Sequence, residues 1–403
     1  MLSAAVLVLS LLLRIAPVLA QQNSAPAIKL EPVELVLHSA TFGTRMLSPD
    51  MKWTSPTGKG GMNHFVPLGD GIDALWTPGG LLLLDAWGTA DEVLADGKLQ
   101  LADVVGDGRY IWASASYGRG VFILSPDGQT LATIDANNGL PASDAGGPVL
   151  HPIAPGRVLA AGDDAKHHCA WIATLTISTD AVKVEMFHEA AKQWPQTVVP
   201  AVEFDPGMYF KPTAFFEIPS ANPQARRLIF MPRGKHNPLV LDVTNHRMGV
   251  YPSRDPNGHS FSRSEAGRDG AVVAGGLLWV AGAGSNFQSY KFADQAGMFS
   301  VERRRENWDI GNQRAGSLAL DGQWLYYAGV SCWRRVNLSN GREELLISDP
   351  RVLPNYGSGE NWTLARSSRY GLVAFNGGTL YRVHVPAEAS PTTAQAVSAA
   401  DRN

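Results

Sequence analysis

The feature that most constrains the fold of this chain is a unit that recurs along most of its length. In each copy a polar or glycine-containing turn leads into a short strand of bulky apolar residues, and a second polar loop and another strand follow. The turns lie at Gly71, Gly108, Gly156, Arg226, Gly276, Gly322 and Arg369. Successive turns are 37 to 70 residues apart, and repeats of about 40–50 residues with four short strands each are typical of a β-propeller. The sequence therefore predicts an all-β fold, a seven-bladed β-propeller of four-stranded antiparallel blades.

The sixth unit shows the pattern most clearly. Strands are expected over residues 317–320, 324–327, 333–337 and 343–346, and Asp321-Gly322 between the first two is a hairpin-type dipeptide. Trp112, Trp279 and Trp324 recur in the second strand of their units. Since such strands pack on both faces, we expect these three indoles to lie between neighbouring blades.

The seventh unit is one strand short. It has expected strands over 362–365, 372–375 and 380–383, and a polar tail then follows Pro386. An open propeller would leave an unpaired strand edge, which proteins avoid. The apolar segment from Val33 to His38 is a candidate to fill this position. We therefore expect the ring to be closed by an N-terminal strand made of these residues.

The N-terminus has the composition of a secretory signal. Residues 4–13 are apolar, and Val18-Leu19-Ala20 precedes Gln21 as a plausible cleavage site. No Lys or Arg comes before the apolar run and Arg14 interrupts it, so a wrongly assigned start codon is the alternative. The expected organisation is a signal peptide over 1–20, a linker over 21–30, the propeller over 31–386 and a disordered tail over 387–403. The protein is then exported, either periplasmic or secreted.

Charge and composition limit the classes of partner that the protein is expected to bind. The formal net charge of −3 gives no reason to expect binding to nucleic acid or to an anionic membrane. No segment after the signal is long and apolar enough to be a transmembrane span. The two cysteines, Cys169 and Cys332, fall in different blades, so two separate thiols are expected rather than a disulfide. A monomer is the expected state.

Candidate ligand-binding residues are identified by the repeat register. In a propeller, the loops before the first strand of each blade and those between the second and third strands share one face, around the mouth of the central channel. Loops of this face carry basic, amide and hydroxyl side chains, which suit an anionic or hydroxyl-rich ligand. The predicted ligand-binding residues are His64, Arg119, Asp164, His167, His236, Arg314 and Asn361.

Residues 163–168, Asp-Asp-Ala-Lys-His-His, form the densest polar cluster in the chain. A divalent cation there is one interpretation, but the spacing matches no strong metal motif, and adjacent histidines on an extended segment point in opposite directions. A solvated loop with one His toward the channel is favoured, and no cofactor is expected. Catalytic motifs are absent, although Asp144, Asp163, Asp164 and Glu360 are eligible as an acid–base pair.

One segment resembles a known repeat. Residues 120–128, followed by Asn138-Gly139-Leu140-Pro141, resemble the repeat of two-component-regulator propellers, and Leu353-Pro354-Asn355 resembles a degenerate second copy. The chain is also loosely similar to quinoprotein-type and WD40-like bacterial propellers, but it lacks the tryptophan-docking motif of the quinoproteins. These resemblances imply the fold, not a signalling role or a quinone cofactor.

The sequence favours a non-catalytic exported propeller that binds a carbohydrate-like or anionic molecule at the loop-lined mouth. Two alternatives stay open. One is a propeller enzyme, such as a polysaccharide lyase or hydrolase or a metal-dependent lactonase. The other is a protein-interaction scaffold, which would show an apolar patch on one face and no pocket.

The signal-peptide interpretation makes a direct prediction. Protein recovered from the periplasm or the medium should begin at Gln21 or within a few residues of it, because export removes the signal. Mass spectrometry of the intact exported protein measures this. Met1 retained on the exported protein would contradict it.

Overall fold

The computed structural model describes most of the chain between Ile28 and Pro386. The residues outside the description are 1–27, 40–42, 48–63, 70, 78–79, 85–88, 95–98, 100, 117, 144–146, 165–168, 180, 190–211, 219–225, 233–238, 251–269, 282–286, 296–297, 306–316, 330–331, 348–352, 354–361, 377–378 and 387–403. The predicted signal peptide and the predicted tail therefore lie outside it. Among the described residues no helix is long and apolar enough to cross a bilayer.

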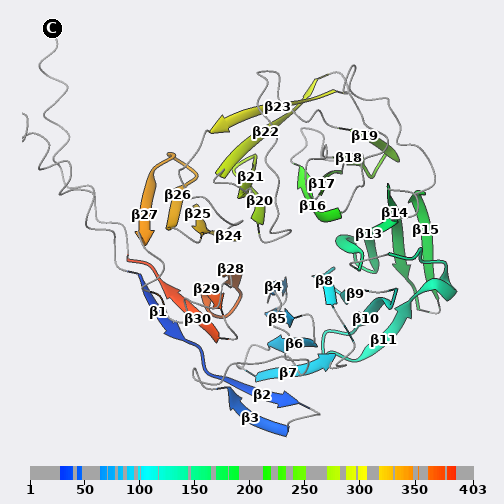
Figure 1. Ribbon diagram of the computed structural model, residues 1–403, viewed down its shortest axis with the longest axis horizontal. Helices are drawn as coiled ribbons and strands as arrows, with labels where there is room; N and C mark the ends of the chain where they lie inside the picture. Colours follow the sequence, from blue (N-terminus) through cyan, green and yellow to red (C-terminus); the bar gives the residue numbers. More distant parts are fainter. Residues whose placement is uncertain are drawn as a thin grey trace, which may run out of the picture.

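The described strands form six four-stranded sheets and one six-stranded sheet, arranged in a ring around a central axis (Figure 1). We number the sheets 1 to 7 by the chain order of their innermost strands. The all-β propeller expected from the sequence is confirmed. Each of the seven predicted turns lies between the first two strands of one sheet. The expectation of four strands in every blade is wrong for sheet 1, which has two additional strands on its outer edge.

The strand bounds are as follows, from the inner to the outer strand. Sheet 1 has β4 (His64–Gly69), β5 (Ile72–Thr77), β6 (Gly80–Leu84) and β7 (Thr89–Leu94), then β2 (Leu35–Ser39) and β3 (Gly43–Leu47). Sheet 2 has β8 (Leu101–Gly106), β9 (Ile111–Ala115), β10 (Gly120–Leu124) and β11 (Thr130–Ile134), followed by the 3-10 helix η1 (Ala136–Asn138). Sheet 3 has β12 (Val149–Ala154), β13 (Arg157–Asp164), β14 (Cys169–Ile177) and β15 (Val182–His188).

Sheet 4 has β16 (Pro212–Ile218), β17 (Arg227–Pro232), β18 (Leu239–Asp242) and β19 (Arg247–Val250). Sheet 5 has β20 (Ala271–Ala274), β21 (Leu277–Ala281), β22 (Phe287–Gln295) and β23 (Met298–Arg305). Sheet 6 has β24 (Ser317–Asp321), β25 (Trp324–Ala328), β26 (Trp333–Asn337) and β27 (Glu343–Ile347). Sheet 7 has β28 (Thr363–Ser367), β29 (Gly371–Asn376), β30 (Thr379–His384) and β1 (Lys29–Pro32).

The core is divided among the interfaces between neighbouring sheets. Each neighbouring pair of sheets shares an apolar cluster, and the cluster that joins sheet 7 to sheet 1 includes Phe65, Leu82, Val373 and Phe375. Every residue of β6, β9 and β25 is buried, whereas the outer strand β11 has a single buried residue, Ile134. Inner strands that are buried on both faces explain why the sequence shows continuous apolar runs rather than alternation.

The three predicted interface tryptophans lie where the repeat pattern puts them. Trp112 packs in the cluster between sheets 2 and 3, Trp279 in that between sheets 5 and 6, and Trp324 in that between sheets 6 and 7. All three indoles are buried. Cys332, directly before β26, is a buried free thiol, and Cys169 belongs to β14 of sheet 3.

The N-terminal segment closes the ring, but with different residues from those predicted. The closing strand is β1, Lys29–Pro32, which pairs antiparallel with β30 and takes in the last two residues of the expected linker. The backbone N–H of Val33 adds a 2.9 Å hydrogen bond to the carbonyl oxygen of Leu380. The predicted segment, Val33 to His38, mostly belongs to β2, which pairs parallel with β7 of sheet 1 and antiparallel with β3. The N-terminal arm, which we define as residues 29–47, therefore pairs with sheet 7 through β1 and with sheet 1 through β2.

Polar side chains also cross the sheet interfaces. At the closure, the Ser367 hydroxyl donates to Asp73 Oδ2 at 2.6 Å, although 294 residues separate them. Between sheets 2 and 3, the Leu150 N–H donates to Asp103 Oδ2 at 2.7 Å. Asp73 and Asp103 are both buried. Buried carboxylates need such donors, and each of these bonds fixes how two neighbouring sheets align.

The closing strand gives a stability prediction. A chain that begins at Glu34 lacks β1, its pairing with β30 and the packing of Ile28 and Leu30 against the cluster between sheets 6 and 7. We expect its free energy of unfolding to fall by about 3 kcal/mol, from lost ladder hydrogen bonds and apolar burial. Urea denaturation measures this. A chain that begins at Ile28 is the control and should match the full-length protein, and equal midpoints for all three chains would contradict the closure by β1.

The closure also predicts a pH dependence. Burial raises the pKa of the Asp73 carboxyl, and the hydrogen bond from Ser367 offsets this only in part. The folded chain thus keeps this proton to a higher pH than the unfolded chain. Its stabilising contribution is complete below about pH 4 and is lost as the pH rises through the raised pKa. Asp73→Asn, whose amide oxygen still accepts from Ser367, should remove this term.

Urea denaturation from pH 4 to 7 should therefore show wild type losing stability relative to Asp73→Asn as the pH rises. Asp127→Asn is the control. The Ser125 hydroxyl holds the pKa of exposed Asp127 below its usual value, so against that variant any drift should have the opposite sign. Parallel profiles for wild type and Asp73→Asn would show that Asp73 does not titrate differently on folding.

Candidate functional site

The two faces of the ring are defined by strand direction. The first strand of each sheet runs toward the turn that joins it to the second strand, and we call that side the turn face. On it, the N–H of Gly156 in the β12–β13 turn donates to Asp107 Oδ2 in the β8–β9 turn at 2.8 Å. The opposite side is the loop face. There the N–H of Gly147, before β12, donates to Ser116 Oγ, after β9, at 3.2 Å.

Three of the predicted ligand-binding residues lie at the loop-face ends of their elements. His64 is the first residue of β4, Asp164 is the last residue of β13, and Arg119 lies in the turn between β9 and β10. The side chain of Arg119 is exposed, whereas those of His64 and Asp164 are outside the description. His167, His236, Arg314 and Asn361 lie outside the described residues. Their convergence around the channel mouth therefore stays a prediction.

The acidic part of the 163–168 cluster has a structural role. Asp163 is 1% exposed, and its Oδ1 accepts a 2.8 Å hydrogen bond from the Ser143 hydroxyl in the segment before β12. The Trp171 indole N–H donates to the Ala142 carbonyl oxygen beside it at 3.1 Å. These bonds anchor the chain that enters sheet 3. The part of the chain that the structure describes contains no group of three or more His, Cys, Asp or Glu side chains placed to hold a metal ion.

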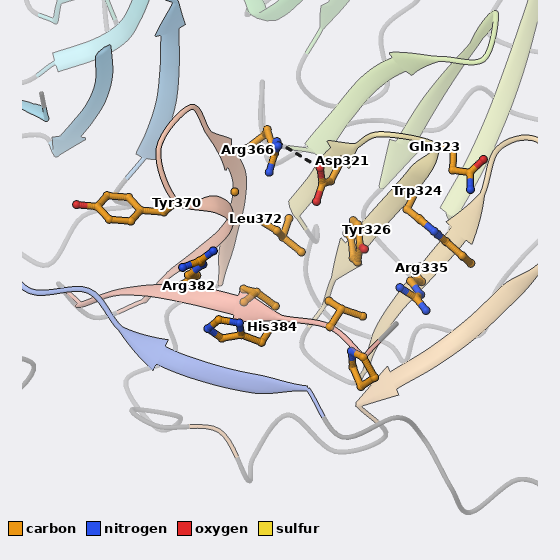
Figure 2. Close-up of a pocket in the computed structure, with 14 residues that line it drawn as sticks. Asp321, Gln323, Trp324, Tyr326, Arg335, Arg366, Tyr370, Leu372, Arg382 and His384 are labelled. Carbon is orange, nitrogen blue, oxygen red and sulfur yellow. Dashed lines mark ion pairs between the residues drawn. The ribbon is translucent and has the colours of Figure 1, made fainter. Parts of the chain in front are cut away.

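A pocket that the sequence did not reveal lies on the turn face between sheets 6 and 7 (Figure 2). Its volume is about 470 Å³, and β25, β26, β28, β29 and β30 all contribute lining residues. Figure 2 shows Arg366 facing Asp321 across the two sheets, whereas Arg382 and His384 lie on β30, apart from this pair. Since the lining comes from strands that are far apart in the sequence, no local motif marks the site.

The walls of this pocket are fixed by close contacts. The Arg335 guanidinium lies 4.1 Å from the centre of the Trp324 ring, and its Nε is 2.7 Å from Glu344 Oε2. Arg366 Nε is 3.3 Å from Asp321 Oδ1. Burial raises the pKa of the Tyr326 phenol, so its hydroxyl stays protonated at neutral pH. The pocket therefore presents guanidinium groups and a neutral hydroxyl.

Comparison with known proteins identifies the fold. No protein-family profile matches the chain, and no curated protein matches it in sequence. A chain of the mitotic checkpoint complex is 10% identical, with a TM-score of 0.53 over 85% of this chain and 92% of that one. YCF48 from Cyanidioschyzon merolae is 12% identical, with a TM-score of 0.50 over 89% and 98%. These solved structures support the propeller fold.

Another similar structure is the extracellular domain of BT4673 from B. thetaiotaomicron, a putative one-component system. It is 9% identical, with a TM-score of 0.49 over 88% of this chain. The present chain spans 40% of the length of that domain.

Proposed function

We propose that this protein is an exported, non-catalytic propeller that binds a carbohydrate-like or anionic ligand at the loop-lined mouth of its channel. The observation that carries the proposal is the position of Arg119. It is exposed in a loop-face turn between buried Ser116, which follows the last residue of β9, and buried Gly120, the first residue of β10. An exposed guanidinium on a fixed support can form two parallel hydrogen bonds to a carboxylate or phosphate.

The fold favours binding at this face. Propeller loops vary without disturbing the sheets beneath them, so ligand residues gather on loops held by a rigid scaffold. Asp164 and His64 lie at strand ends on the same side. The other predicted residues, His167, His236, Arg314 and Asn361, belong to loops that the repeat register assigns to this face.

A glycoside hydrolase would need two carboxylic groups facing one substrate. Of the four eligible carboxylates, Asp163 is buried and hydrogen-bonded to Ser143, which leaves it no route to a substrate. This observation argues against Asp163 as a member of such a pair.

Arg119→Ala tests the mouth against a matched control. Arg109 is also an exposed arginine of sheet 2, but it lies in the β8–β9 turn on the turn face and stacks 5.0 Å from the Tyr110 ring. Titration calorimetry with an oligouronate should show about tenfold weaker binding for Arg119→Ala, because one charge-assisted contact is lost. Arg109→Ala should bind like wild type, and a neutral oligosaccharide of equal length should bind more weakly than the oligouronate.

Equal binding by wild type and Arg119→Ala would place the ligand elsewhere. No binding of either saccharide by wild type would overturn the proposed ligand class.

A further inference from the structure

The pocket between sheets 6 and 7 lies where the ring omits a hairpin. In sheet 6, Leu338 of the β26–β27 hairpin packs on the cluster shared with sheet 5. In sheet 2, Gly128 of the β10–β11 hairpin approaches Val93 of sheet 1 so closely that a β-carbon would collide with it. Sheet 7 has no such hairpin among its described strands, because its fourth strand is β1 from the N-terminus. The pocket therefore stays uncovered on the side of sheet 7.

The strand register decides which lining side chains of sheet 7 face the pocket. Leu372 belongs to the cluster shared with sheet 6, and Arg366 is directly opposite it across the β28–β29 pair, so both point toward sheet 6. Arg382 is opposite Val373, which packs toward sheet 1. His384 is two residues further along β30 and shares that side. Arg382 and His384 therefore border the pocket without pointing their side chains into it.

The same register applies to the wall formed by sheet 6. Trp324 and Tyr326 belong to the cluster between sheets 6 and 7 and so point toward sheet 7. Asp321 is opposite Trp324 and Arg335 is opposite Tyr326, which gives them the same direction. The contact between Arg366 Nε and Asp321 Oδ1, at 3.3 Å, joins the two walls. The polar groups that share the pocket are thus Arg366, Asp321, Tyr326 and Arg335.

The guanidinium groups that face the pocket are already paired with carboxylates. Arg366 pairs with Asp321. Arg335 is 5% exposed, and both its Nε and its Nη2 contact Glu344 Oε2, at 2.7 and 2.5 Å. No unpaired arginine therefore faces the pocket from the described residues. Such walls favour a neutral ligand whose polar groups can both donate and accept hydrogen bonds.

Hydrogen-bonding capacity remains on three of these groups. Arg335 donates to the Tyr326 hydroxyl, whose own O–H then has no acceptor among the described residues. Asp321 Oδ2 and the Nη groups of Arg366 also lack a partner there, since the contact between these two residues uses Oδ1 and Nε. Gly371 makes room for the guanidinium, because a β-carbon on it would lie 2.9 Å from Arg366 Nη1. The pocket thus offers a donor and an acceptor side by side, and a second donor on the next strand.

This arrangement matches the neighbouring hydroxyls of a sugar ring. One hydroxyl can accept from Arg366 while the next donates to Asp321, and a third can accept from Tyr326. Leu372 and Val385 supply apolar surface for the C–H groups of the ring. The pocket volume of about 470 Å³ lies within the range of small-molecule sites.

We infer that this pocket is a second binding site, on the turn face and distinct from the channel mouth, for a neutral sugar ring with neighbouring hydroxyls. Arg366 and Asp321 bind two adjacent hydroxyls without separating from each other, and Tyr326 binds a third. Because the walls belong to sheets 6 and 7, the bound sugar bridges the last sheet to its neighbour. Its binding therefore stabilises the ring of sheets.

The test measures calorimetric binding and thermal unfolding of the full chain with glucose, galactose and mannose, which differ in the orientation of their hydroxyls. Tetrahydropyran-2-methanol, which has the ring but no neighbouring hydroxyls, and glucuronate, which adds a charge, are the control probes. At about ten times its dissociation constant, the hexose that fits best should raise the melting temperature by about 2 °C. The same concentration of tetrahydropyran-2-methanol should cause no shift, and glucuronate should bind no more tightly than that hexose.

Arg366→Ala and Asp321→Asn should each weaken binding of that hexose about tenfold, because each removes a charge-assisted hydrogen bond. Asp321→Asn keeps a residue type that suits the tight turn after β24, so it tests the site with the turn intact. Tyr326→Phe should weaken binding about fivefold, since it removes a hydrogen bond between neutral groups. Arg382→Ala is the matched control. It removes an exposed arginine of the same sheet whose side chain points toward sheet 1, and it should bind like wild type.

Four results would overturn the proposal. The first is no binding of any hexose at about 20 mM, which is well above the millimolar dissociation constant expected for so small a ligand. The others are equal affinity for the hexoses and tetrahydropyran-2-methanol, equal hexose affinity in wild type and Arg366→Ala, and tighter binding of glucuronate than of every hexose.

Arg119→Ala separates this site from the channel mouth. The variant alters the loop face and should bind the hexose like wild type. Loss of hexose binding in Arg119→Ala but not in Arg366→Ala would place the sugar at the mouth and overturn the pocket proposal. The two proposals therefore fail separately.

Discussion

The structure depends on one constraint, which is that its inner strands are apolar on both faces. The residues on both faces of β9 and of β25 are buried, so each sheet needs a neighbouring sheet on both of its faces. A linear row of such sheets would leave two apolar end faces in water, at a cost of about 25 cal/mol for each Å² of apolar surface. A ring leaves no end face. The cluster of Phe65, Leu82, Val373 and Phe375 is where the first and last sheets meet to satisfy this requirement.

The closure is also where the chain makes its least local contacts. β1 and β30 lie at opposite ends of the described chain, and bringing them together has an entropic cost that grows slowly with loop length. The N-terminal arm offsets this cost twice, once through β1 on sheet 7 and once through β2 on the outer edge of sheet 1. The buried bond between Ser367 and Asp73 adds a directional contact that apolar packing lacks. Together they fix which faces of the two sheets meet.

Much of this fold could be predicted from the sequence because its turns are local. Asp321-Gly322 and Gly108 specify tight turns through their own backbone preferences, and the strands next to them follow. The closing strand could not be placed in the same way. Lys29–Pro32 is short and polar, and β2 is the more apolar segment. Which of the two pairs with β30 depends on the path of the arm across two sheets, and this path leaves no periodic signal in the sequence.

The two candidate sites also differ in how far the sequence could predict them, because only one of them follows the repeat. Arg119 could be assigned to the loop face because one repeat register orders all the loops. The pocket could not, because Arg366, Arg382 and Trp324 come from different strands of two sheets and no spacing relates them. Its origin lies in topology. A ring closed by an N-terminal strand must omit one hairpin in its last sheet, and in sheets 2 and 6 that hairpin packs on the preceding sheet. The polar and charged groups that line the pocket are therefore left uncovered by a hairpin of sheet 7.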